Sequence, residues 1–171
     1  MIRMKLLVVL LAALLVALFV KAATLNTGGD GPVRPAPDLT FTRLKDGPNT
    51  LSAMRGKVVV LDFWATWCGP CRMAIPELQK LYVKHKKDGL QVIGISVDEP
   101  ETQPNIPQVQ KELGMTYPVL LASEVPDVRT KYQFSGIPAL FVIDRKGVIR
   151  FQLDGYSPVV IDKIEEILKE S

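Results

Sequence analysis

Cysteine and histidine, the usual ligands of zinc, are scarce in this sequence, which has two cysteines and one histidine among 171 residues. A structural zinc site takes four ligands, usually with a second cysteine or histidine pair, so the composition argues against a zinc centre. Cys68 and Cys71 are also too close together for a strongly stabilising disulfide. Closing so short a loop contributes about 2 kcal/mol, against roughly 4.7 kcal/mol for a 100-residue loop. Their spacing favours reversible thiol–disulfide exchange, in which one sulfur attacks and the other resolves.

An excess of charge of either sign is missing from most of the chain. The formal net charge is +3, from 21 Lys and Arg against 18 Asp and Glu. Three of the cations, Arg3, Lys5 and Lys21, precede the first acidic residue, so the remaining 18 cations equal the acids in number. A near-neutral domain gives no reason to expect a nucleic-acid partner.

Long apolar runs are absent apart from one at the N-terminus. Arg3 and Lys5 precede residues 6–20, which are apolar without interruption, a pattern typical of an export signal. Fifteen helical residues span about 22 Å, short of the roughly 30 Å hydrocarbon core, but flanking cations can snorkel. We expect residues 1–23 to be a signal peptide or, slightly favoured by Lys21, a membrane anchor. Both interpretations place the rest of the chain in the periplasm or on the outer face of the membrane.

The region after this leader divides into a linker and one domain. Residues 24–37 contain three glycines, three prolines and few apolar side chains, which predicts a flexible linker. Residues 38–171 are long enough for one domain with a full hydrophobic core. At its start, residues 39–42 alternate and Asp46-Gly47 favours a turn, so we expect a β-hairpin.

Apolar runs alternate with helical periodicity through the rest of the domain, which predicts an α/β sheet with helices on both sides. The run at 58–63 is continuous and therefore typical of a strand covered on both faces. The other expected strands are 91–97, 118–122, 139–143 and 148–153, and the expected helices are 68–87, 106–113, 127–132 and one beginning near 158.

The cysteine pair lies at a predicted strand-to-helix junction. The unpaired N–H groups and partial positive charge of a helix N-terminus stabilise a thiolate, so Cys68 is expected to be the nucleophile. Cys71, one turn into the helix, is expected to resolve the mixed disulfide. Gly69 and Pro70 carry no positive charge between the sulfurs, which argues for a reducing couple.

An acidic residue interrupts the predicted buried strand. Asp62 lies six residues before Cys68, and burying a carboxyl group is costly unless it has partners or a task. We expect burial to raise its pKa and Asp62 to exchange protons with Cys71, directly or through water. The alternative is a strand-end acid that reaches solvent or pairs with Lys57. Of the neighbouring tryptophans, Trp64 is expected in the core and Trp67 on the surface around the thiol.

These motifs together resemble the thioredoxin superfamily. They are Cys-Gly-Pro-Cys after Trp67, Phe-Trp-Ala at 63–65, and Gly-Ile-Pro at 136–138. The leader, the hairpin and the additional segment at 106–122 make the chain most similar to the TlpA/ResA-like extracytoplasmic thiol-disulfide oxidoreductases. The resemblance implies a thioredoxin-like fold: a central mixed sheet flanked by helices, with an N-terminal β-hairpin and an inserted α-β unit.

The resemblance also implies how the site operates. Cys68 attacks, Cys71 resolves, and a cis Pro138 packs beside the disulfide while the backbone of Ile137 pairs with an extended client segment. The implied client-binding residues are Trp67, Gly69, Pro70, Ile137 and Pro138. The cysteine pair is the only redox group, with no other cofactor and no metal. Implied partners are disulfide-containing proteins such as apocytochrome c and a membrane thiol donor of electrons, with the chain a monomer.

Two positions depart from the TlpA-like pattern. Many of those proteins have Asn where this chain has Asp62, and a Glu where it has Ala74. The acidic site that they use in cytochrome maturation is therefore not inferred for this chain. Three alternatives stay open on the residues alone. They are a disulfide oxidase or isomerase using the same cysteines, a metal-delivery module binding through both thiolates, and a peroxidase, which would need a Pro-x-x-x-Thr-x-x-Cys motif that the sequence lacks.

Overall fold

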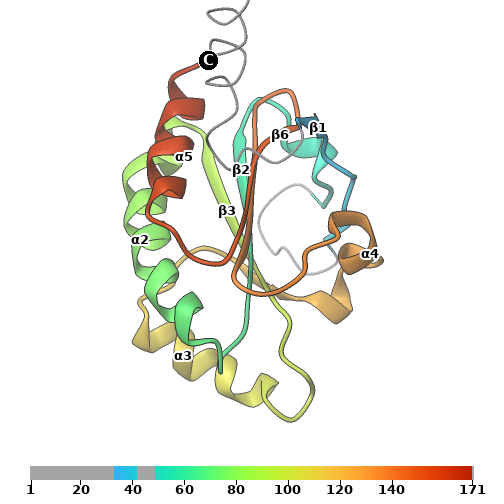
Figure 1. Cartoon of the computed structure of the whole chain (residues 1–171), viewed down its shortest axis with the longest axis vertical. Helices are drawn as coiled ribbons and strands as arrows, with labels where there is room; N and C mark the ends of the chain where they lie inside the picture. The colour runs from blue at the N-terminus through green and yellow to red at the C-terminus, as the bar shows by residue number, and fades with distance from the viewer. Residues whose placement is uncertain (1–32, 42–48, 171) are drawn as a thin grey trace, which may run out of the picture. The chain divides into compact units, whose positions relative to one another are not determined.

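The computed structural model describes residues 33–41 and 49–170 (Figure 1). Within these residues, six strands form one mixed sheet in the order β1-β6-β5-β2-β3-β4. The strands are β1 Arg34–Pro35, β2 Val58–Trp64, β3 Leu90–Ser96, β4 Val119–Leu121, β5 Ala139–Ile143 and β6 Val148–Asp154. The α-helices are α2 Gly69–His85, α3 Ile106–Glu112, α4 Val128–Tyr132 and α5 Val159–Lys169, and short 3₁₀ turns lie at Ser52–Met54, Lys86–Asp88, Gln103–Asn105 and Ala122–Glu124.

The central strand β2 is buried along its whole length. It pairs parallel with β3 on one side and antiparallel with β5 on the other. Figure 1 shows α2 and α5 on one side of the sheet and α4 on the other. The continuous apolar run therefore forms a strand covered on both faces, and the predicted mixed sheet flanked by helices is confirmed.

The predicted inserted unit is formed by α3 and β4. Strand β4 extends the sheet by pairing parallel with β3, in the register Gly94↔Val119 and Ser96↔Leu121. The segment just before β4 also contacts β3, where Gly94 N donates a hydrogen bond to Pro118 O at 2.9 Å. From this segment the Tyr117 side chain reaches the predicted site residue Asp62 on β2.

The N-terminal segment differs in detail from the prediction. Arg34 and Pro35 fall in the predicted linker but form β1, which pairs with β6 at the edge of the sheet, where a proline is tolerated. Within the described residues, the predicted hairpin is seen as the antiparallel bridge Thr40↔Thr50, with backbone hydrogen bonds from Phe41 N to Asn49 O at 2.7 Å and from Leu51 N to Leu39 O at 2.9 Å. The Asp38 carboxylate also joins the two segments by accepting hydrogen bonds from Ser52 N and Oγ at 2.8 and 2.7 Å. The predicted turn at 46–47 lies outside the described residues.

No helix within residues 33–41 and 49–170 has the length and apolar character needed to cross a membrane. The predicted leader, residues 1–23, and the first part of the predicted linker lie outside the described residues.

Candidate active site

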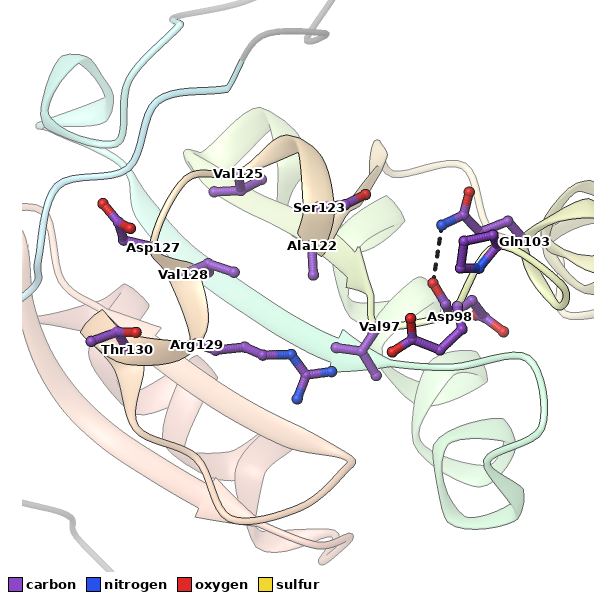
Figure 2. A pocket seen from close by; sticks show the side chains of 12 residues that line it. Val97, Asp98, Gln103, Ala122, Ser123, Val125, Asp127, Val128, Arg129 and Thr130 are labelled. Atoms are coloured by element: carbon purple, nitrogen blue, oxygen red, sulfur yellow. Dashed lines mark hydrogen bonds between the residues drawn. The ribbon is translucent and has the colours of Figure 1, made fainter.

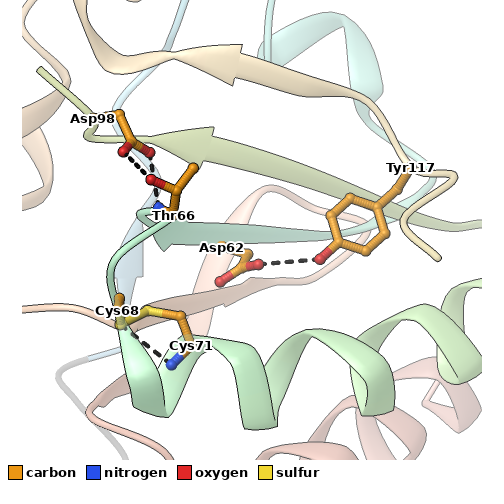
Figure 3. Close-up of a disulfide and its surroundings, with 6 residues drawn as sticks. All are labelled: Asp62, Thr66, Cys68, Cys71, Asp98 and Tyr117. Carbon is orange, nitrogen blue, oxygen red and sulfur yellow. Dashed lines mark hydrogen bonds between the residues drawn. A yellow bond between two sulfur atoms is a disulfide. The ribbon is translucent and has the colours of Figure 1, made fainter. Parts of the chain in front are cut away.

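The two cysteines form a disulfide at the start of α2 (Figure 3). Cys68 occupies the N-cap position, and its Sγ accepts a hydrogen bond of 3.2 Å from the backbone N–H of Cys71. Only 4% of the surface of Cys68 is exposed, and none of Cys71. The helix terminus therefore directs an N–H group at the sulfur of Cys68, the less deeply buried of the two cysteines.

Asp62 lies in β2 with no exposed surface. Its Oδ2 accepts a 3.2 Å hydrogen bond from the Tyr117 hydroxyl, while the buried Oδ1 has no hydrogen-bond partner. Burial raises the pKa of Asp62 to about 7, and the Tyr117 hydrogen bond partly opposes this rise. The expected direction of the pKa is confirmed, and the alternative of an acid that reaches solvent is wrong.

Figure 3 shows Asp62 between Tyr117 and the disulfide, with its unpaired oxygen on the side of the cysteines. A carboxyl group that is partly ionised near pH 7 can accept or return a proton in this pH range. The arrangement thus combines a redox-active sulfur pair with a buried carboxyl group.

The strand register brings the predicted proline to the same end of the sheet as the cysteines. Ala139 of β5 pairs with Phe63, so Pro138 lies beside the end of β2 from which the Cys68 loop departs. The Ile137–Pro138 peptide bond is cis, as the resemblance implied. Pro138 is buried and Ile137 partly exposed, while Gly69 and Pro70 are exposed.

The two tryptophans separate as expected. Trp64 is fully buried, whereas Trp67, directly before Cys68, is 62% exposed. Met73, the fifth residue of α2, is also largely exposed. Large exposed apolar side chains around a reactive group commonly mark a surface that contacts other proteins.

Comparison of the sequence with protein-family models assigns a chain with this disulfide and cis proline to a known family. Residues 32–152 match the AhpC/TSA family. The chain belongs to the AhpC/TSA family. A relative from Geobacillus kaustophilus, thiol-disulfide oxidoreductase ResA, is 33% identical over 120 residues, which are 70% of this chain and 67% of the relative. The ResA of Oceanobacillus iheyensis is 29% identical, covering 92% of this chain and 83% of the relative.

A solved structure supports the same assignment within the family. The thioredoxin-family thiol:disulfide interchange protein of Chlorobium tepidum is 28% identical, with a TM-score of 0.67 over 81% of this chain and 99% of the other. This AhpC/TSA member is therefore a thiol-disulfide oxidoreductase of the thioredoxin-like type, similar to ResA. Within the described residues, no three His, Cys, Asp or Glu side chains are grouped to hold a metal ion.

A second buried acid holds the loop that carries Cys68, and the sequence analysis missed it. Asp98 follows β3 and accepts hydrogen bonds from Thr66 N at 3.0 Å, Thr66 Oγ1 at 2.7 Å and Ser96 Oγ at 2.8 Å. Burial acts to raise the pKa of Asp98, but these hydrogen bonds outweigh it and the pKa is lowered. The available signal was an acid directly after a buried parallel strand, since the carboxyl ends of adjacent parallel strands lie at one edge of the sheet.

A pocket of about 530 Å³ adjoins Asp98 (Figure 2). It lies between the end of β3 and α4, and Arg129 extends across it towards Val97. Neither cysteine nor Asp62 lines it, and the carboxylate of Asp98 is already occupied by Thr66 and Ser96. We therefore place the chemistry at the disulfide and not in this pocket.

Replacing Asp98 should loosen the active-site loop. Asp98→Ala leaves the buried donors of Thr66 and Ser96 unpaired, so we expect the free energy of unfolding to fall by about 1–3 kcal/mol. Chemical denaturation of the oxidised protein measures this change, and Glu99→Ala, at an exposed neighbouring position, is the matched control. Equal stabilities of the two variants would contradict this role for Asp98.

Proposed function

We propose that this oxidoreductase reduces disulfides in protein clients, with Cys68 as nucleophile, Cys71 as resolving residue and Asp62 as proton acceptor. The observation that carries the proposal is the position of Cys68 at the N-cap of α2, where its Sγ accepts a hydrogen bond from Cys71 N, together with the deeper burial of Cys71. Only Cys68 retains exposed surface, and a buried acid with a pKa of about 7 lies behind the pair.

The reaction consists of two thiol–disulfide exchanges. The Cys68 thiolate attacks one sulfur of the client disulfide, forming a mixed disulfide and releasing the first client sulfur as a thiolate, which takes up a proton. Asp62 accepts the proton of Cys71, whose thiolate then attacks Cys68 Sγ and releases the second client sulfur. The client gains two electrons, and the enzyme is left with the Cys68–Cys71 disulfide.

The client-binding surface belongs to the same proposal. Trp67, Gly69 and Pro70 flank Cys68 in the chain and are exposed, and the Ile137–Pro138 segment lies at the same end of the sheet. We propose that an extended client segment lies across this surface, with its backbone along Ile137. If the client disulfide lies within this extended segment, one of its sulfur atoms would lie next to Cys68.

The location and the partners are proposed from the sequence. An apolar leader at 1–23 followed by a predicted linker that precedes β1 favours tethering at the outer face of the membrane. That compartment is oxidising, so a reductase there needs a dithiol donor supplied across the membrane. Apocytochrome c is a proposed client by analogy with the TlpA/ResA-like proteins, and we expect the chain to act as a monomer.

The redox potential tests the proposed direction. With no positive charge between the cysteines, we expect a potential near that of thioredoxin, about −270 mV, rather than near −120 mV. Equilibration of the full chain with glutathione or dithiothreitol buffers gives the value. A potential above about −170 mV would assign the oxidase or isomerase activity instead. Equilibrium dialysis of the reduced protein against copper or zinc addresses metal delivery, for which we expect no stoichiometric binding.

A further inference from the structure

The inserted unit contributes a residue to the buried acid of the active site. Tyr117 lies between α3 and β4, 55 positions from Asp62, and only 2% of its surface is exposed. Its hydroxyl donates to Asp62 Oδ2 at 3.2 Å, the one hydrogen bond to the Asp62 carboxyl group within the described residues.

Room for this contact is provided by a glycine on the neighbouring strand. Gly94 of β3 pairs directly with Asp62 of β2. A Cβ atom at Gly94 would lie 3.3 Å from Tyr117 Cε2 and 3.1 Å from Trp64 Nε1, distances that are tight for carbon contacts. The missing side chain therefore lets the tyrosine ring lie against β3 and reach the acid.

Helix α2 holds the tyrosine from the other side. The Gln79 side chain donates to Thr116 Oγ1 at 2.8 Å and accepts from Thr116 N at 2.9 Å. Tyr82 contacts the Tyr117 ring edge-on, with centroids 6.0 Å apart. The residue before Tyr117 and the ring itself are thus both fixed to the helix that carries the cysteines.

Few other groups can influence the charge of Asp62. Its strand neighbours, Gly94 on β3 and Leu140 on β5, carry no charge. Among the described residues, the titratable groups that face it are the Tyr117 hydroxyl and, after reduction, the Cys71 thiol. The burial of Tyr117, followed by the charge of Asp62 beside it, raises the pKa of the phenol well above its usual value, so it stays a donor.

We propose that Tyr117 is a positioning residue that holds Oδ2 of Asp62 and leaves Oδ1 free for the proton of Cys71. The inference rests on the role of Asp62 proposed above and extends it to the inserted unit. A donor to the ionised carboxylate stabilises the charged form more than the neutral form. Without it, Asp62 would hold its proton to higher pH, and less of the base would be available at pH 7.

The test is a direct titration of the Asp62 carboxyl group in the oxidised full chain. Carbon-13 NMR of labelled aspartate follows it in detergent solution, and the signal missing from Asp62→Asn identifies it. In Tyr117→Phe we expect the midpoint to move upward by about one pH unit, the effect of losing a hydrogen bond to a charged group. Tyr82→Phe, which removes a neighbouring hydroxyl not bonded to Asp62, is the matched control and should keep the wild-type midpoint.

A midpoint in Tyr117→Phe at or below the wild-type value would overturn the proposal. If Tyr117→Phe does not fold, Gln79→Ala decides, because it keeps the ring but frees Thr116, and its midpoint should also rise. An unchanged midpoint in that variant would then reject the positioning role. If the NMR midpoint rises while the pH–rate profile of exchange does not follow it, the positioning of Asp62 by Tyr117 stands and Asp62 is not the proton acceptor.

Discussion

Cys71→Ser should convert the enzyme into a covalent trap for its clients. Cys68 can still attack a client disulfide, but no second thiol is present to release the product, so the mixed disulfide accumulates and turnover is abolished. Non-reducing gel electrophoresis followed by mass spectrometry of the adducts measures this in intact cells. The same adducts would identify the client class, including any apocytochrome c.

The matched control is Cys68→Ser, which retains the inner thiol alone. Cys71 has no exposed surface in the structure, so we expect no trapped client and no turnover. Both variants keep a small side chain at the start of α2, and serine is itself a favourable N-cap residue. Adducts through Cys71 in Cys68→Ser, or none through Cys68 in Cys71→Ser, would reverse the proposed order of attack.

Local patterns in the sequence were sufficient for the central part of the fold. The apolar run before the cysteines became β2, and the strand-to-helix junction placed Cys68 at the N-cap of α2. The burial of Asp62 followed in the same way, because a strand covered on both faces leaves an acid no route to water. These predictions depend on residues that lie within about fifteen positions of one another. Over that distance, the regular geometry of a single strand or helix determines where each side chain lies.

Other parts of the site depend on contacts between distant segments, which no local pattern encodes. Tyr117 reaches Asp62 only because β4 adds to the sheet beside β3 and Gly94 leaves room for its ring. Asp98 reaches Thr66 because β2 and β3 are parallel neighbours. Strand β1 was missed since a two-residue edge strand containing a proline has no periodicity to detect.

Asp62→Asn should slow thiol–disulfide exchange at neutral pH, chiefly at the step in which Cys71 is deprotonated. General base catalysis contributes roughly 10²-fold or more, so we expect about that loss at pH 7 with client attack by Cys68 less affected. Because the pKa of Asp62 is about 7 in the oxidised protein, the wild-type rate should rise through this pH and the variant should lose that inflection. Stopped-flow fluorescence from pH 5 to 9 measures both, and an unchanged profile would return Asp62 to a purely structural role.

The stability of Asp62→Asn gives an independent check, because the raised pKa of Asp62 fixes the direction in which stability changes with pH. The pKa of Asp62 is raised from 3.8 to about 7 on folding, so the native state keeps a proton that the unfolded chain releases between these values. The contribution of Asp62 to the free energy of unfolding should therefore fall as pH rises from about 4 to 7, by at most roughly 4 kcal/mol, and then level off. Asn cannot ionise, so the oxidised variant should lack this decrease. The free energy of unfolding of the variant minus that of the wild type should therefore be larger at pH 8 than at pH 4. Parallel denaturation curves for the two proteins across this range would contradict a buried, protonated Asp62.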